Sequence, residues 1–239
     1  MLPLTESSWK CQDGSTSVFE RPLGFLELGF YWDGVFERTA DTLQHAEVEV
    51  DPEHFRQAVS PSNVVRVWTD LKLQYPLLGA QIEERNEDAI FFVVSEDHLR
   101  SCRTGEVTFQ KISSEAEAMD IAERIIVHDK LLSETLLASI CLLERTDVPN
   151  RIHLLIHVAH CITDGMANIT ILKTFLDQLC KDSPPKPNIM QRLALSRACE
   201  DLAPQRKFSA AKRRWRWAIS KVITTRRNPR LSVTDIYNS

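Results

Sequence analysis

Residues 151–168 read RIHLLIHVAHCITDGMAN and hold three histidines and an aspartate in a largely apolar run. The β-branched and aliphatic residues, preceded by the polar loop TDVPN, favour a strand that leaves a hairpin over a helix. Alternate side chains of a strand share a face, so His153 and His157 should lie together, with His160 at the strand's end. The sequence therefore predicts a strand that turns after His160 into a helix over residues 166–180.

Two other uses of this stretch are weaker. A metal site would need His157, His160 and Asp164 to converge, but a turn separates them and no fourth ligand is near in the sequence. Cys161 beside His160 is a poor nucleophile–base pair, because adjacent strand residues face opposite ways. We therefore predict no metal site here and expect Cys161 to pack in the core.

The rest of the chain mixes strand and helix patterns. Strands are expected at residues 25–37, 46–50, 89–95 and 134–145. Apolar residues spaced by three or four predict two helices: one between Pro61 and Pro76 with Ser62 as its cap, and one over 114–132 with Ile121, Ile125 and Val127 facing inward. The expected fold class is α/β (α+β), a mixed sheet flanked by helices. The stretch KDSPPKPN at 181–188 is typical of the start of a linker.

Composition indicates an ordinary globular protein, with 43% hydrophobic residues in 239. The first residues lack the basic start and apolar run of a secretory signal, and no run approaches the roughly 18 apolar residues of a membrane span. The six cysteines are scattered without a C-x-x-C pair. We therefore expect a reducing, cytoplasmic compartment.

Charge is divided sharply along the chain. Residues 206–239 hold ten Lys or Arg and one Asp, a net charge of +9, which leaves −13 on residues 1–205 for a total of −4. This basic segment also makes one apolar stripe at helical spacing, formed by Trp215, Ala218, Ile219 and Val222. Contact with nucleic acid or an acidic membrane is one interpretation, but a helix that lies on a protein surface is favoured. We expect a basic helical C-terminal tail and no nucleic-acid partner.

The run His160-Cys-Ile-Thr-Asp164-Gly165 between a strand and a helix resembles the HxxxDG motif of the CoA-dependent acyltransferase superfamily. That superfamily groups chloramphenicol acetyltransferase, plant and fungal alcohol acyltransferases and peptide-synthetase condensation domains. YPLLGAQIEE at 75–84 looks like the segment after their first long helix, and LKTFLDQL resembles the helix after the motif. The resemblance covers residues 20–182 in the expected order and is nearest to the fungal alcohol or secondary-metabolite type.

This resemblance implies a domain organisation. Residues 1–182 would form a chloramphenicol acetyltransferase-like half-domain, 183–205 a linker and 206–239 the basic amphipathic tail.

The resemblance also implies a chemistry. His160 would be the general base that deprotonates an acceptor hydroxyl, or less readily an amine, as it attacks an acyl-CoA thioester; imidazole suits this role near pH 7. Asp164 would support the loop by pairing with an arginine, for which Arg38 and Arg85 are candidates, and it could at the same time cap the following helix. Gly165 would permit a sharp turn and could aim its amide at a developing oxyanion. No bound cofactor is implied, acyl-CoA being a co-substrate, and the residues that bind it are unknown.

Three departures from the family pattern keep two classes of function open. Ala159 stands where condensation domains carry a second histidine, which disfavours condensation; Gly79 and Gln81 replace arginines that relatives often carry; and no DFGWG-like loop of a second half is present. The chain is expected to be either an acyltransferase, completed by a homo-oligomer or by a missing second-half partner, or an inactive acyltransferase remnant that serves as an interaction module.

Overall fold

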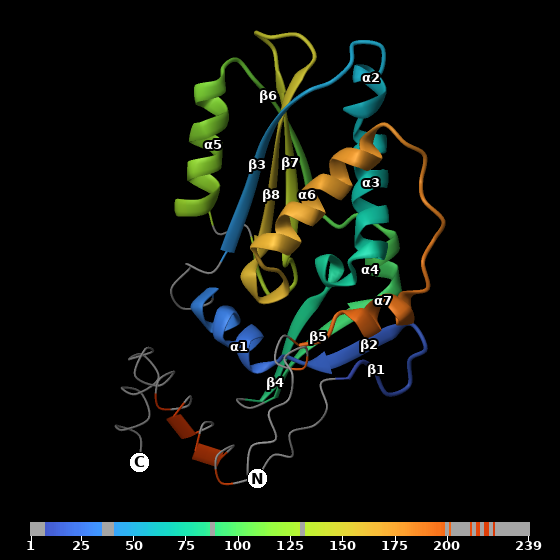
Figure 1. Ribbon diagram of the computed structural model, residues 1–239, viewed down its shortest axis with the longest axis vertical. Coiled ribbons are helices and arrows are strands. Elements are labelled where there is room, and N and C mark those ends of the chain that lie inside the picture. Colours follow the sequence, from blue (N-terminus) through green and yellow to red (C-terminus); the bar gives the residue numbers. More distant parts are fainter. Residues whose placement is uncertain are drawn as a thin grey trace.

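The computed structural model describes residues 8–34, 41–86, 89–129 and 132–198. It also describes seven single positions beyond them: Asp201, Ala211, Arg214, Trp215, Ala218, Ile219 and Val222. These residues form two four-stranded sheets flanked by helices (Figure 1). The predicted mixed α/β class is confirmed, with two sheets in place of the single one expected.

The larger sheet contains the histidine-rich strand at its centre. Its order is β3 (Asp41–Glu49), β8 (Arg151–Ala159), β7 (Ala138–Arg145) and β6 (Val107–Ile112). Only the β6–β7 pair is parallel, so the sheet is mixed. The TDVPN loop closes the predicted β7–β8 hairpin with Asn150 at φ 59°, a left-handed conformation that asparagine tolerates well.

Helices cover both faces of this sheet. Helix α5 (Glu115–Val127) lies on one face, whereas α3 (Pro61–Gln74) and α6 (Gly165–Leu179) lie on the other (Figure 1). The alternation of β8 explains the division: Leu155 packs with the α5 cluster, and the even-numbered residues pack with α3 and α6.

Both helices were predicted from their periodicity, and each needs one correction. The helix α3 is capped by Ser60, whose hydroxyl accepts the backbone N–H of Asn63 at 3.4 Å, and not by Ser62. In α5, Ile121 and Ile125 are buried as expected, but Val127 in the last turn is exposed. The periodicity places the apolar face correctly but does not fix the ends of the helix.

The smaller sheet is entirely antiparallel. Its order is β1 (Lys10–Cys11), β2 (Val18–Pro22), β5 (Ala89–Ser95) and β4 (Gln81–Asn86), which confirms the strand expected at 89–95. The short helices α2 (Phe55–Ala58) and α4 (Glu96–Arg100) and the 3-10 turn η2 (Pro76–Gly79) complete the connections around α3.

The strand predicted at 25–37 is wrong, because residues Phe25–Trp32 form helix α1. The buried Glu27 carboxylate accepts the backbone N–H of Gly24 at 2.6 Å and two hydrogen bonds from the buried Arg21 guanidinium at 2.6 and 2.7 Å. A carboxylate that satisfies an N–H ahead of the first turn starts a helix. The run itself is apolar on both faces, so periodicity does not separate strand from helix there.

The range expected to be a linker contains a packed helix. Residues 182–188 have no regular structure, but α7 (Ile189–Leu195) buries Ile189 and Leu193 in the core of the smaller sheet. Beyond α7, the Ser196 carbonyl accepts hydrogen bonds from the Trp9 indole at 2.9 Å and from Arg21 at 3.1 Å. At least α7 therefore belongs to the folded body, and the division into half-domain, linker and tail stays a prediction.

Most of the basic tail lies outside the described residues. Within it, Trp215, Ile219 and Val222 are helical and exposed. None of the helices in the described part of the chain is long and apolar enough to cross a bilayer.

Candidate active site

The histidine motif lies at the junction of β8 and α6. After β8 ends at Ala159, residues His160–Ile162 make a single 3-10 turn, η3, and Thr163 and Asp164 run extended into α6. The sequence therefore predicted this strand-to-helix turn correctly. A Cβ at Gly165 would meet no atom within 4 Å and its φ is not positive, so the turn does not require a glycine there.

The imidazole of His160 is fixed by a backbone carbonyl. Its Nδ1 lies 2.7 Å from the carbonyl oxygen of Thr163 across the turn. A carbonyl only accepts hydrogen bonds, so Nδ1 carries the proton and the neutral ring keeps its lone pair on Nε2. A half-buried imidazole held in this tautomer is ready to accept a proton at Nε2.

Helix α1 brings a second aromatic ring onto His160. The rings of Phe30 and His160 stack with centroids 3.9 Å apart and an interplanar angle of 11°. This contact restricts rotation of the imidazole, and the face of the phenyl ring favours a positive charge on it. Sequence reasoning missed Phe30, because a strand was expected at this position. The sequence did contain a signal for the start of α1, which is the acidic residue Glu27 three positions after Gly24.

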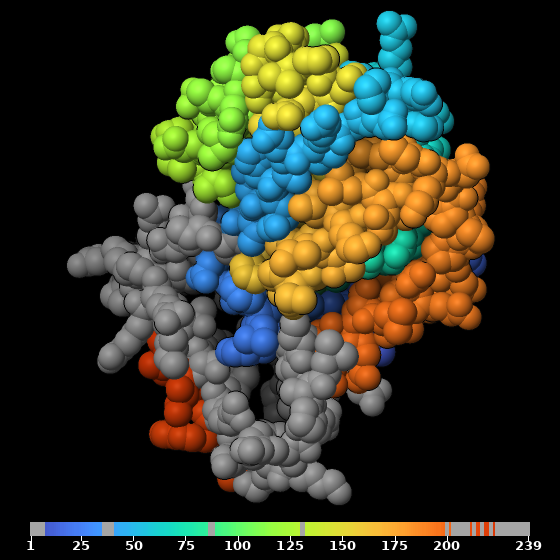
Figure 2. Space-filling model, turned by 45° about the horizontal axis from the view of Figure 1, so that its top comes forward, coloured from blue at the N-terminus to red at the C-terminus, as the bar shows by residue number. Residues whose placement is uncertain are grey.

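A cavity of about 60 Å³ opens beside His160. Its lining is mostly apolar and comes from α1, from the C-terminal end of α5, from the segment before β7 and from the motif; it includes Phe30, Tyr31, Ile125, Leu132, Leu137 and His160. In Figure 2, α1, β3 and α6 lie next to one another on one face of the molecule. Asp41, Asp129 and Glu134 also line the cavity, so the proton acceptor lies beside a cavity whose wall is apolar with three carboxylates in it.

The structure shows the capping role that the sequence allowed for Asp164, and pairing of Asp164 with an arginine stays a prediction. Asp164 is exposed, and its carboxylate accepts the backbone N–H of Ala167 at 2.8 Å, which caps α6. Arg85, one candidate partner, instead pairs with Glu20 at 2.6 Å in the smaller sheet, so that prediction is wrong. Arg38, the other candidate, lies outside the described residues. Among the arginines that the structure describes, none forms an ion pair with Asp164.

Cys161 and His157 are both buried and are poor reactive groups. Burial raises the pKa of the Cys161 thiol, and the side chain packs in the core of the smaller sheet, as expected. Burial lowers the pKa of His157 to about 4, so this ring is neutral at pH 7. Neither ring nitrogen of His157 forms a hydrogen bond with a described residue; the nearest carboxylate oxygen, on Asp41, is 3.9 Å from Nε2. In the described parts of the chain, no three His, Cys, Asp or Glu side chains are placed to hold a metal ion.

Comparisons with known proteins agree with this geometry at the level of the fold. No family model and no curated protein matches the sequence. Among solved structures, the TRI3 trichothecene 15-O-acetyltransferase of Fusarium sporotrichioides aligns with a TM-score of 0.58 at 14% identity, over 75% of this chain and 38% of that one.

Two condensation domains align similarly. A variant of the starter condensation domain of the rhizomide synthetase RzmA gives a TM-score of 0.56 at 12% identity, over 73% of this chain and 42% of that one. The condensation domain of the Monacolin K polyketide synthase MokA gives 0.54 at 8%, over 72% and 37%. The chain therefore has the fold of part of these acetyltransferase and condensation-domain structures, in agreement with the acyltransferase-like half-domain fold expected from the sequence. It spans about two fifths of the length of the solved structures that it matches.

Proposed function

We propose that this chain serves in acyl transfer from a CoA thioester to a hydroxyl group of a small-molecule acceptor, with His160 as the general base. The observation that carries the proposal is the hydrogen bond from His160 Nδ1 to the Thr163 carbonyl, 2.7 Å long, on an imidazole that lines a cavity. It leaves Nε2 as the proton acceptor. The match in fold to acyltransferases and condensation domains supports the same class of reaction.

In the proposed reaction, Nε2 of His160 takes the acceptor's hydroxyl proton while the acceptor oxygen attacks the thioester carbonyl. The tetrahedral intermediate then expels the CoA sulfur, which receives the proton from the imidazolium, so that an ester and free CoA leave the site. The stacked Phe30 ring stabilises the imidazolium between the two steps. The amide of Gly165, at the start of α6, would stabilise the developing oxyanion.

A hydroxyl acceptor is favoured over an amine. Ala159 occupies the position before His160, where condensation domains carry a second histidine. The matched TRI3 enzyme is named as a 15-O-acetyltransferase, which transfers to a hydroxyl oxygen. The proposed acceptor is therefore an alcohol, and acyl-CoA is a co-substrate that binds transiently.

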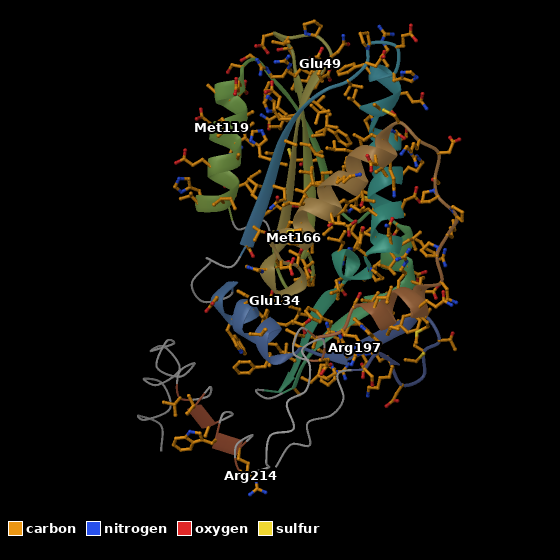
Figure 3. All side chains as sticks on the ribbon, in the orientation of Figure 1. Glu49, Met119, Glu134, Met166, Arg197 and Arg214 are labelled. Atoms are coloured by element: carbon orange, nitrogen blue, oxygen red, sulfur yellow. The ribbon has the colours of Figure 1, made fainter. Side chains whose placement is uncertain are left out.

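The chain spans about two fifths of the length of the solved structures that it matches, so the rest of an active-site channel would come from another chain. Exposed apolar side chains lie on the two helices next to the motif: Phe25 and Leu26 on α1, and Met166 and Ile169 in the first turns of α6 (Met166 is labelled in Figure 3). We propose that a second copy of the chain or a separate partner covers this apolar face and forms the opposite wall of the channel.

The direct test incubates the full chain with acetyl-CoA and longer acyl-CoAs and a panel of primary, secondary and phenolic alcohols. Free CoA and ester mass are followed together, so that transfer is distinguished from thioester hydrolysis, and light scattering gives the oligomeric state of the active fraction. Ester formation is the expected result. Absence of ester with every donor, in a folded preparation of any oligomeric state, would contradict the proposal.

A further inference from the structure

Three polar side chains form a row of hydrogen bonds behind His160. The Thr163 hydroxyl donates to the Asn168 side-chain oxygen at 2.9 Å, the Asn168 amide donates to the Thr42 hydroxyl at 3.0 Å, and the Thr42 hydroxyl donates to the Val158 carbonyl at 3.0 Å. The row runs from the turn before α6 through α6 to β3 and ends on β8. It joins segments that are more than a hundred residues apart in the chain.

The direction of these bonds is determined by their ends. The Val158 carbonyl can only accept, so it takes the Thr42 hydroxyl proton, and the Thr42 oxygen is left to accept from the Asn168 amide. The Asn168 oxygen then accepts from Thr163, whose hydroxyl lies closer to it than to the Asp164 carbonyl at 3.4 Å. All three hydrogen bonds therefore run in one direction, with each side chain donating to the next group from Thr163 to the Val158 carbonyl.

The burial of Asn168 makes this row unusual. Asn168 is 1% exposed and occupies the inward face of α6, where Ile171 and Phe175 pack against the sheet. A buried amide costs free energy unless it is fully hydrogen-bonded, and an apolar side chain would pack there without that cost. A polar residue at such a core position therefore calls for a role beyond packing.

The row ends on the residue that orients the base. Thr163 supplies the carbonyl that accepts from His160 Nδ1 at 2.7 Å, whereas its own backbone N–H makes a long bond of 3.4 Å to the His160 carbonyl. The short bond of its hydroxyl to Asn168 is thus the stronger anchor of Thr163. Displacing Thr163 would move the carbonyl that selects the tautomer of His160.

We propose that Asn168, Thr42 and Thr163 are positioning residues that hold the Thr163 carbonyl in place and thereby keep His160 in the Nδ1–H tautomer. This inference rests on the proposed role of His160 as the general base. None of the three side chains needs to touch a substrate, and each acts through the imidazole.

The test compares hydroxyl-deleting with hydroxyl-keeping substitutions in the full chain. Thr163→Val and Thr42→Val remove one bond each at nearly constant volume, whereas Thr163→Ser and Thr42→Ser keep the hydroxyl. Long-range proton–nitrogen NMR spectra of the histidine rings, with His160 assigned by comparison with His160→Gln, report which ring nitrogen carries the proton. We expect His160 to be Nδ1–H in wild type and in both serine variants, and to populate both tautomers in the valine variants.

Activity gives a second measure. The valine variants should lose about tenfold in kcat, about 1.4 kcal/mol of barrier, with KM for the thioester nearly unchanged and with recovery in the serine variants. If Thr163→Val does not fold, Thr42→Val, at the far end of the row, carries the test. Wild-type tautomers of His160 in the folded valine variants would overturn the inference. The predicted spectra in a chain without transferase activity would instead overturn only the proposed function.

Discussion

Two contacts from different parts of the chain fix the orientation of the His160 ring. The motif that contains it was recognisable in the sequence, and so was the turn at the end of the strand. The Thr163 carbonyl is local to that turn, but the Phe30 ring reaches His160 from α1, 130 residues earlier. Contacts of the second kind depend on how distant elements pack, and no spacing within the motif encodes them.

Asp164 is expected to contribute to stability mainly as the cap of α6. Asp164→Ala removes the carboxylate that accepts the Ala167 N–H and should lower the free energy of unfolding by about 1 kcal/mol. Asp164→Asn keeps an acceptor oxygen and should cost only a few tenths of that. Urea unfolding of the two variants and the wild type gives the comparison.

The asparagine variant also separates capping from charge. If capping is the whole role of Asp164, Asp164→Asn keeps both stability and acyl transfer. Loss of transfer with an unchanged unfolding curve would show that the negative charge acts on the reaction or on a cation outside the described residues.

His157 should make the protein less stable in mild acid. Its folded pKa of about 4 lies below the value near 6.5 expected in the unfolded chain, so between these values only the unfolded state binds the proton. The free energy of unfolding should therefore fall as pH drops through this window, by about 2 kcal/mol between pH 7 and pH 5 from this residue.

The matched variant is His157→Leu, which removes the titrating ring and its two unpaired nitrogens at similar size. Burial also lowers the pKa values of His98 and His153, so only the difference between the two chains isolates His157. Urea unfolding at the two pH values should show a clearly smaller acid loss in the variant. Equal losses in both chains would exclude His157 as a source of the pH dependence.

Periodicity predicted the helices that have one apolar face, and β-branched and aliphatic content predicted the strands that are buried on both faces. The helices α3, α5 and α6 and the strands β5, β7 and β8 fall where the pattern placed them. Among the elements that the sequence did not predict, α1 and α7 show a physical reason. The helix α1 is apolar on both faces and begins at a buried ion pair, and α7 follows a proline-rich stretch that is typical of linkers.

The helix α7 should be required for stability. A chain shortened to end at Asp182 loses the buried Ile189 and Leu193 and the Ser196 carbonyl that accepts from Trp9 and Arg21. Burial of two aliphatic side chains is worth on the order of 3 kcal/mol or more. The shortened chain should therefore unfold at lower urea concentration than a chain that ends at Asp201, which keeps α7 and removes most of the basic tail. Coinciding curves for these two chains would show that α7 adds nothing to the folded body.

For the whole molecule, the sequence predicted the class of fold but not the division of the strands into two sheets or the extent of the folded body. The motif and the order of elements were sufficient for an acyltransferase-like half, and solved structures of that fold align over about three quarters of the chain. The division of the strands into two sheets depends on long-range contacts that a local pattern does not contain. The same holds for the packing of α7, which follows the irregular residues 182–188. The charge difference between an acidic body and a basic tail remains the clearest whole-chain feature of the sequence, and its role stays a prediction.

General-base catalysis by His160 is best examined by comparing two histidine variants of the full chain. His160→Ala removes the proton acceptor beside the cavity, whereas His157→Leu removes a buried histidine three residues earlier, on β8. With the best acyl-CoA and alcohol pair, at pH 7.5 and with matched unfolding curves, the rate of ester formation should fall by about 10²–10⁴ in His160→Ala and stay within a few-fold of wild type in His157→Leu. A rate in folded His160→Ala equal to that of the wild type would contradict the role given to His160.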